Sequence, residues 1–235
     1  MSIVERGPRK DRTPRSRWPE RHTHEPRQRE PQEREPGPPP RMRFGYPIVT
    51  LLLVGLCVLV FVYGYTTQSE NRIINEYSYR PALLQFADAD VFMRLITHLF
   101  VHDGWVHLLV NMLVLYTFGR GLEPAMGSIR FLILYLVAGI AAAIGQGLLT
   151  DSTQAQLVGA SGAISGILGA AVVAAPRMMV LFFVFPMPLF ISVIILVALH
   201  IAAIAFQWEP EVAWHAHLVG LAAGALLYPV LRRRF

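Results

Sequence analysis

Six apolar segments of 18 to 22 residues dominate this sequence from residue 45 onward. An α-helix rises 1.5 Å per residue, so each segment is long enough to cross most or all of the ~30 Å hydrocarbon core of a bilayer. The segments cover residues 45–66, 105–122, 130–149, 158–175, 186–207 and 213–231. Because lipid offers no hydrogen-bond partner to the backbone, we expect helices throughout and an all-α polytopic membrane protein.

Residues 1–43 have a different composition and form a separate part of the chain. They hold 12 of the 21 Lys and Arg residues, 7 of the 16 Asp and Glu residues and 9 of the 17 prolines. Such a segment buries too little apolar surface to offset the entropy of ordering, so we expect a disordered, Arg- and Pro-rich tail. Its acidic residues argue against a mitochondrial transit peptide, and it has no apolar core typical of a cleavable signal. The membrane domain is then expected to cover residues 44–235.

The arginines predict the orientation of the helices. If the N-terminus is cytoplasmic, 18 Lys and Arg residues lie inside and only Arg72, Arg80 and Arg94 lie outside. Six spans then leave both termini in the cytoplasm, and we expect an integral protein of a prokaryotic plasma membrane. The long outer loop at 67–104 contains apolar patches, so part of it is expected to lie on or in the outer leaflet.

Charge and cysteine content exclude several classes of protein. The net charge of +5 is that of the tail alone, so the membrane domain is not expected to bind nucleic acid. Cys57 is the single cysteine, which excludes an intrachain disulfide and a cysteine-based zinc site.

Histidine, serine and asparagine are the notable polar residues inside the apolar segments, and no Asp or Glu lies near the middle of any segment. Such residues are costly in a bilayer and are candidates for function. Segments 105–122, 158–175 and 213–231 all run inward, and each carries polar groups near its outer end. These groups are His107 and Asn111, Ser161, and His217. Their common depth predicts one shared site in the outer half of the membrane.

Glycine spacing predicts which helices pack together. One helical face carries Gly159, Gly162, Gly166 and Gly169, and another carries His217, Gly220 and Gly224. Faces of small residues let two backbones approach closely in lipid, so we expect these two helices to pack with His217 toward Ser161. His215 lies about 160° around the same helix and is expected to point elsewhere.

Ser161 and His217 have the chemistry of a nucleophile and its general base. Gly159 leaves space and open amides beside the hydroxyl, and His107 and Asn111 share a helical face from which they can donate to an oxyanion. An interhelical hydrogen bond is the alternative role for Asn111. No carboxylate is placed behind His217 by its spacing, so we expect a Ser–His dyad. The carboxylates considered, all in loops, are Asp103, Glu209 and Glu211.

Three motifs together resemble those of the rhomboid intramembrane serine proteases. Residues 102–111 read HDGWVHLLVN, similar to the family's H-x4-H-x3-N. Residues 159–162 read GASG, like its G-x-S-G, and residues 216–224 read AHLVGLAAG, like its A-H-x2-G-x3-G. The resemblance covers residues 45–235.

The resemblance implies a six-transmembrane-helix rhomboid-like bundle with a long outer loop between the first two helices. It implies Ser161 as nucleophile, His217 as base, and His107 and Asn111 near the oxyanion. It also implies that the substrates are transmembrane segments of other membrane proteins, cut near the outer face. They would approach laterally near the fifth span, which has Trp208 at its outer end.

The sequence departs from the family pattern at two positions. The family often has Trp-Arg in its first outer loop, where this chain has Met93-Arg94. It also often has an aromatic residue four positions after the serine, against the base, where this chain has Ser165.

Two other classes of protein are alternatives. One is a catalytically silent, rhomboid-like membrane scaffold, and the other is a haem or metal protein that uses the many histidines. Six histidines lie near one face: His98, His102, His107, His200, His215 and His217. That second alternative has no Cys or carboxylate ligand at depth and gives no role to the GASG motif, so no cofactor and no metal are expected. The partners expected are substrate helices and the lipid bilayer, and the oligomeric state stays open.

Overall fold

The computed structural model describes residues 46–81, 89–150, 156–182, 184–208 and 212–233. The tail expected at 1–43 lies outside these residues. The described part is almost entirely helical, with one short 3₁₀ helix and one two-stranded antiparallel hairpin. The elements are α1 (Ile48–Thr66), α2 (Glu70–Tyr77), α3 (Ala89–Thr97), η2 (His98–Phe100), α4 (Trp105–Met126), α5 (Ser128–Leu149), α6 (Ser161–Ala174), β1 (Met179–Phe182), β2 (Phe185–Pro188), α7 (Leu189–Ala205) and α8 (Trp214–Leu231).

Six of these helices correspond to the six apolar segments: α1, α4, α5, α6, α7 and α8. By length and composition, α1, α5 and α8 are each able to cross a membrane. A fourth candidate is α4 taken together with the α3–η2 segment before it, from which it is bent by 83°. The remaining two are shorter, with 14 residues in α6 and 17 in α7. The all-α membrane fold is therefore confirmed, whereas the count of six spans stays a prediction.

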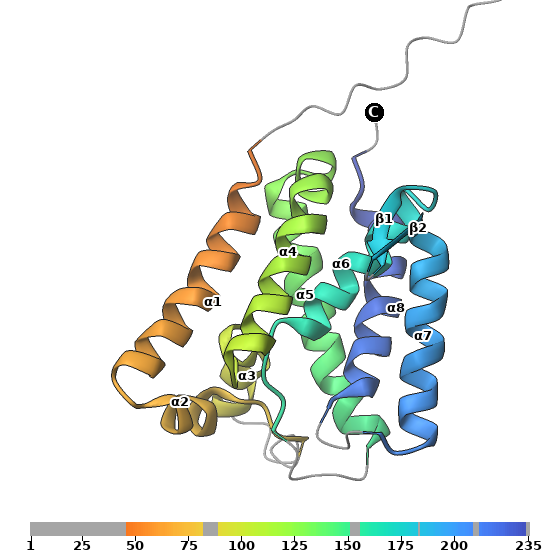
Figure 1. Ribbon diagram of the computed structural model, residues 1–235. Helices are drawn as coiled ribbons and strands as arrows, with labels where there is room; N and C mark the ends of the chain where they lie inside the picture. The colour runs from red at the N-terminus through yellow and green to blue at the C-terminus, as the bar shows by residue number, and fades with distance from the viewer. Residues whose placement is uncertain (1–45, 82–88, 151–155, 183, 209–211, 234–235) are drawn as a thin grey trace, which may run out of the picture. The chain divides into compact units, whose positions relative to one another are not determined.

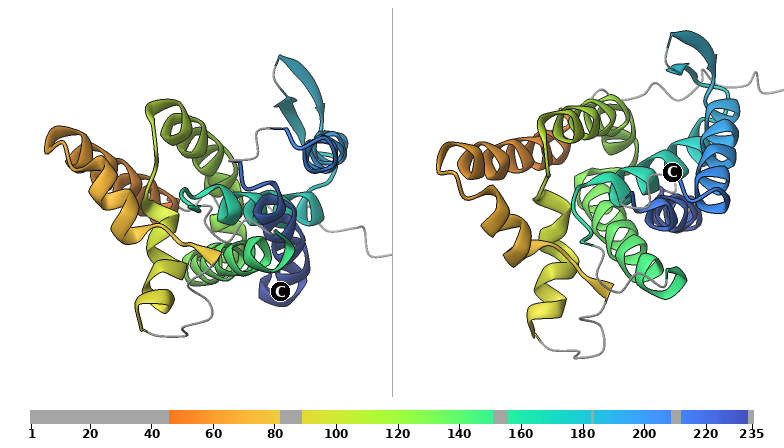
Figure 2. Two further views of the ribbon diagram at one scale, coloured as in Figure 1. Left: turned by 90° about the horizontal axis from the view of Figure 1, so that it is seen from below. Right: turned by 60° about the horizontal axis from the view of Figure 1, so that its bottom comes forward.

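The helices are arranged around α6, which lies between α4, α5 and α8 in the interior of the bundle (Figures 1 and 2). α6 begins at Ser161, three residues later than the sequence predicted. The cause is Gly159, whose φ of +100° is incompatible with an α-helix. The chain just before Ser161 therefore enters the bundle without helical structure, and α6 begins inside the bundle rather than at its end (Figure 1).

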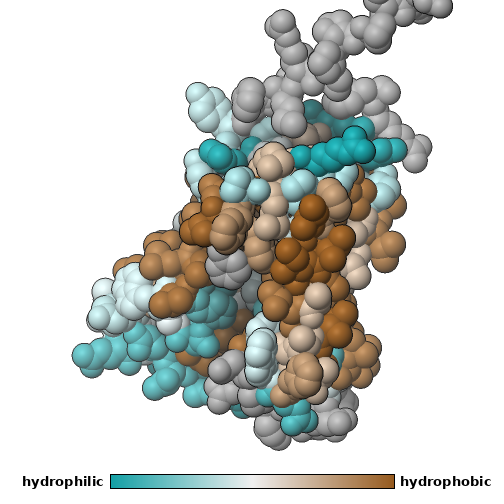
Figure 3. Space-filling model, turned by 45° about the vertical axis from the view of Figure 1, so that its right-hand side comes forward, coloured by the Kyte–Doolittle hydropathy of each residue, from teal (hydrophilic) through white to brown (hydrophobic). Residues whose placement is uncertain are grey.

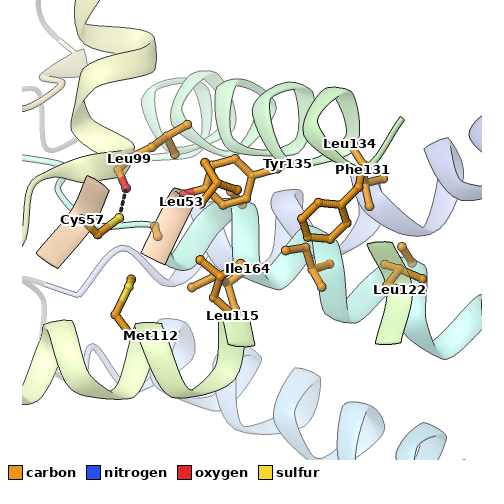
Figure 4. Packing of buried hydrophobic residues seen from close by; sticks show 14 of the residues in the cluster. Leu53, Cys57, Leu99, Met112, Leu115, Leu122, Phe131, Leu134, Tyr135 and Ile164 are labelled. Carbon is orange, nitrogen blue, oxygen red and sulfur yellow. Dashed lines mark hydrogen bonds between the residues drawn. The ribbon is translucent and has the colours of Figure 1, made fainter. Parts of the chain in front are cut away.

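A buried apolar cluster joins α1, α4, α5 and α6 (Figure 4). Its members include Leu53, Cys57, Leu115, Phe131, Leu134, Tyr135 and Ile164. The outer surface is apolar as well, and on the face in Figure 3 apolar side chains form a band between two hydrophilic ends. Such a band is the surface that lipid chains require.

A buried carboxylate fixes the start of α1. Glu123, near the end of α4, accepts hydrogen bonds from the backbone amides of Val49 (3.0 Å) and Thr50 (2.8 Å). It also accepts from the hydroxyls of Thr50 (2.8 Å) and Ser128 (2.6 Å). The first amides of a helix have no partner within that helix, and the helix dipole favours an anion there. Glu123 thus ties α1 to both α4 and α5.

α6 and α8 pack backbone against backbone. A Cβ atom on Gly220 would overlap the carbonyl oxygen of Gly162, and one on Gly224 would overlap that of Gly166. A Cβ atom on Gly169 would likewise meet the carbonyl oxygen of Leu221. The predicted contact between the two glycine faces is confirmed.

This contact predicts that Gly224→Ala destabilises the protein. The methyl group would overlap the Gly166 carbonyl, so the helices must separate, and we expect the free energy of unfolding to fall by about 1–3 kcal/mol. Gly55→Ala in α1 is the matched control, because its Cβ would meet nothing within 4 Å. We expect it to leave stability unchanged or raise it by up to ~1 kcal/mol. Thermal unfolding of the detergent-purified variants measures both, and equal midpoints would contradict the packing argument.

Candidate active site

Ser161 and His217 meet where α6 and α8 pack together. The Oγ atom of Ser161 lies 2.9 Å from Nε2 of His217, which is hydrogen-bond distance. Ser161 is the first residue of α6, and His217 lies in the first turn or so of α8. The start of α8 is held in turn by α5, because the Gln146 side-chain oxygen accepts a hydrogen bond from the Ala216 amide (3.0 Å). Both members of the pair are therefore placed by backbone contacts.

A second histidine stands behind the first. Nδ1 of His217 lies 3.1 Å from Nε2 of His200 in α7, and Nδ1 of His200 lies 2.7 Å from the Leu196 carbonyl oxygen. The sequence analysis considered His200 as a polar residue within a span and as one of the six histidines of the haem or metal alternative, and gave it no place at the serine. Its position could have been found by depth, since it lies five residues before the end of α7, as His217 lies three residues from the start of α8.

The rings around His217 pack edge to face. The His200 and His217 ring centroids are 5.1 Å apart with an interplanar angle of 69°. Trp214 lies against both, with centroids 5.1 Å from His200 and 6.1 Å from His217. Ser165 lines the same small space with these two histidines. The imidazole of His217 is thus held by ring contacts as well as by hydrogen bonds.

His107 and Asp103 form a pair at the start of α4. Nδ1 of His107 lies 2.5 Å from a carboxylate oxygen of Asp103. This hydrogen bond holds the pKa of the Asp103 carboxyl below its ordinary value. The sequence left Asp103 without a partner, and the structure pairs it with His107 rather than with His217. Glu209 and Glu211, the other carboxylates considered, lie outside the described residues.

The other ring nitrogen of His107 faces Gly159. A Cβ atom on Gly159 would lie 2.6 Å from Nε2 of His107 and 3.4 Å from Nδ2 of Asn111. Asn111 is buried, and its Nδ2 atom has no hydrogen-bond partner among the described residues. A buried amide without a partner is uncommon and calls for an explanation. Here it leaves a free donor beside Gly159, which lies two residues before Ser161 in the chain.

The role of Gly159 differs from the one that the GASG motif suggested, which was an open amide beside the serine hydroxyl. Its amide is not open, because it donates a hydrogen bond to the carbonyl oxygen of His98 (2.9 Å). Its positive φ and its missing side chain create the space beside His107 and Asn111 instead. The open amides are those at the start of α6, where helical residues have no earlier partner.

Among the described residues, no histidine side chain other than that of His217 forms a hydrogen bond with Ser161. His217 rather than His215 contacts Ser161, so the predicted register of the last helix is confirmed. Nδ1 of His98 lies 2.9 Å from the Arg94 carbonyl oxygen, and the His102 ring packs against that of His107. Within the described ranges, no three His, Cys, Asp or Glu side chains are grouped closely enough to hold a metal ion.

The chain is similar to known proteins over most of this region. The profile of the Rhomboid domain matches residues 89–234. The chain is 32% identical over 185 residues to YdcA of Bacillus subtilis (strain 168), a match that covers 77% of this chain and 87% of YdcA. It is 28% identical over 178 residues to the rhomboid protease GlpG of Haemophilus influenzae, covering 76% of this chain and 88% of GlpG. The rhomboid protease GluP of B. subtilis is 35% identical over 130 residues, which are 54% of this chain but only 24% of GluP.

The geometry at Gly159 predicts that Gly159→Ala slows the reaction of Ser161 with a fluorophosphonate probe by at least about tenfold. The added methyl group would displace His107 or Asn111, and alanine is strained at φ +100°. Gly121→Ala in α4 is the control, because its Cβ would meet nothing within 4 Å. The labelling rate in detergent is the measurement. Labelling of Gly159→Ala at the wild-type rate would contradict this account of the pocket.

Proposed function

This chain belongs to the rhomboid family of serine proteases, and we propose that it cleaves transmembrane segments of other membrane proteins with Ser161 and His217 as its catalytic dyad. The observation that carries the proposal is the 2.9 Å hydrogen bond between the Ser161 hydroxyl and the His217 imidazole. Gly159, two residues before Ser161, faces the buried Asn111 amide, which has no partner in the described part of the chain.

The dyad would act in two steps. His217 Nε2 takes the proton as Ser161 Oγ attacks the scissile carbonyl carbon, and the imidazolium then gives that proton to the leaving amine. A water molecule, deprotonated by His217, next attacks the acyl-enzyme ester, and the imidazolium returns that proton to Ser161 Oγ as the ester bond breaks. Each step passes through a tetrahedral intermediate that carries one negatively charged oxygen.

Three donors are suited to that oxyanion. Asn111 offers its unpartnered Nδ2 group, and Ser161 offers its own amide at the start of α6, where the helix dipole also favours negative charge. His107 has its Nδ1 engaged by Asp103, so it can donate through Nε2 when the ring is doubly protonated.

The depth of the dyad suits a substrate helix that has unwound locally near the outer face. Peptide bonds in a helix are protected by their own hydrogen bonds, so Gly, Pro or small polar residues near the outer end of a substrate should help cleavage. Access from the side of α7 fits this picture, and Trp208 lies exposed just beyond its end.

The arginine distribution supports an orientation with both termini in the cytoplasm. We place the protein in a prokaryotic plasma membrane. α3 supports contact of the outer loop with the outer leaflet, because it exposes Phe92, Met93 and Ile96.

Ser161→Ala and His217→Ala should each abolish cleavage of a transmembrane substrate in detergent or liposomes without loss of folding. His215→Ala is the matched control, because His217 and not His215 contacts Ser161. We expect it to cost less than about tenfold in kcat/KM, under ~1.4 kcal/mol of transition-state free energy. Cleavage by Ser161→Ala or His217→Ala at the wild-type rate would contradict the proposed dyad. A folded wild-type protein that neither cleaves nor reacts with a fluorophosphonate would favour the silent scaffold.

Asn111→Ala should lower kcat by about 10–10³ with little change in KM, as for the loss of one oxyanion donor. The unpartnered amide predicts little loss of stability beyond that of removing a small buried side chain. Steady-state kinetics and the unfolding midpoint are measured on the same preparation. A large fall in the midpoint with an unchanged kcat would instead assign Asn111 to helix packing.

A further inference from the structure

We propose that His200 is a positioning residue that holds His217 in the one tautomer able to accept the Ser161 proton. The proposal rests on the function proposed above and deepens it, since it concerns the same base. It assigns a role to a side chain of α7 that lies at neither the nucleophile nor the oxyanion.

The argument begins at the Leu196 carbonyl, because a carbonyl oxygen can only accept a hydrogen bond. Nδ1 of His200 lies 2.7 Å from this oxygen, so the proton of the neutral His200 ring sits on Nδ1. Its Nε2 atom then carries a lone pair and is an acceptor. This acceptor lies 3.1 Å from Nδ1 of His217.

The same logic carries across to His217. Its Nδ1 atom must donate to His200, so its Nε2 atom is left with the lone pair. That lone pair faces the Ser161 hydroxyl at 2.9 Å, which is the arrangement a general base needs. In the other tautomer, Nε2–H of His217 would donate to the hydroxyl and could not take its proton, and the Nδ1 lone pair would oppose the lone pair on Nε2 of His200.

His200 also suits the charged form of the base. When His217 takes the serine proton, its Nδ1–H group still needs an acceptor, and His200 Nε2 provides one without adding a buried negative charge. A carboxylate in this place would have to be removed from water at a cost of several kcal/mol. Ring contacts with His200 and Trp214 hold the imidazole in position.

The departure at Ser165 makes room for this arrangement. The family often has an aromatic residue four positions after the serine, against the base, whereas Ser165 here is small and buried. Ser165 lines the same space as His200 and His217. The ring that packs against the base therefore comes from α7 and brings a hydrogen-bond acceptor with it.

Two substitutions separate the hydrogen bond from the packing. His200→Phe keeps a ring but removes the acceptor, and His200→Gln removes the ring but can place an amide oxygen near the former Nε2 atom. We expect His200→Phe to lower kcat at least about tenfold with KM within about threefold, because it frees the tautomer of His217. We expect His200→Gln to retain kcat within about threefold of the wild type. An unchanged kcat in His200→Phe, an effect on KM alone, or an equal loss in both folded variants would overturn the proposal.

A measurement on the unmodified side chains decides the case if neither variant folds. In ¹⁵N-histidine-labelled wild type, the ring signals that vanish in His217→Asn should report a protonated Nδ1 and an unprotonated Nε2. The opposite tautomer would refute the role of His200 even if the protein is an active protease. Failure of the wild type to cleave or to react with the fluorophosphonate would instead count against the proposed function, so the two failures are distinguishable.

Discussion

The backbone contact between α6 and α8 is the constraint on which the rest of the site depends. Two helices in lipid gain nothing from excluding water, so they associate through close packing and hydrogen bonds. Glycines at Gly220 and Gly224 bring the α8 backbone against the carbonyl oxygens of α6. At that separation Oγ of Ser161 on α6 lies 2.9 Å from Nε2 of His217 on α8, while both residues keep their helical backbone. Larger residues on those faces would move the two side chains out of reach.

Several polar groups inside the bundle find partners in neighbouring elements. Glu123 receives the first amides of α1, and Gln146 receives an amide of α8. His200 and His217 pass a chain of hydrogen bonds from the Leu196 carbonyl toward the serine. The Nδ2 group of Asn111 is one of the buried polar groups without such a partner in the described residues, and leaving a buried donor unsatisfied costs about 1–3 kcal/mol. A developing oxyanion would supply the missing acceptor.

Periodicity and depth were enough to predict the six apolar helices, the packing of the two glycine faces and the register that turns His217 rather than His215 toward Ser161. These features follow from hydrophobic runs and helical geometry, which are local properties of the sequence. The late start of α6 was not predicted, because it depends on the positive φ of Gly159. The partners of Asp103 and His200 were missed for a different reason. A hydrogen bond between segments depends on how helices are rotated and shifted, and spacing along the chain does not encode this unless a small-residue face fixes it.

The hydrogen bond to Leu196 lies within α7, one helical turn from His200, so it travels with that helix. The bond from His217 to His200 instead crosses from α8 to α7. If α7 moves away from α8, His200 therefore keeps its hydrogen bond to the Leu196 carbonyl. His217 loses the acceptor that Nε2 of His200 provides. Such a bond contributes only about 0.5–1.5 kcal/mol net, so the separation costs little free energy on that account. A ligand that binds better when α7 is displaced from α8 would thus weaken the hydrogen bond between His217 and His200. By thermodynamic reciprocity, protonation states that strengthen this bond would weaken the binding of that ligand. With the proposed tautomer, we expect the position of α7 and the proton on Nδ1 of His217 to be energetically coupled.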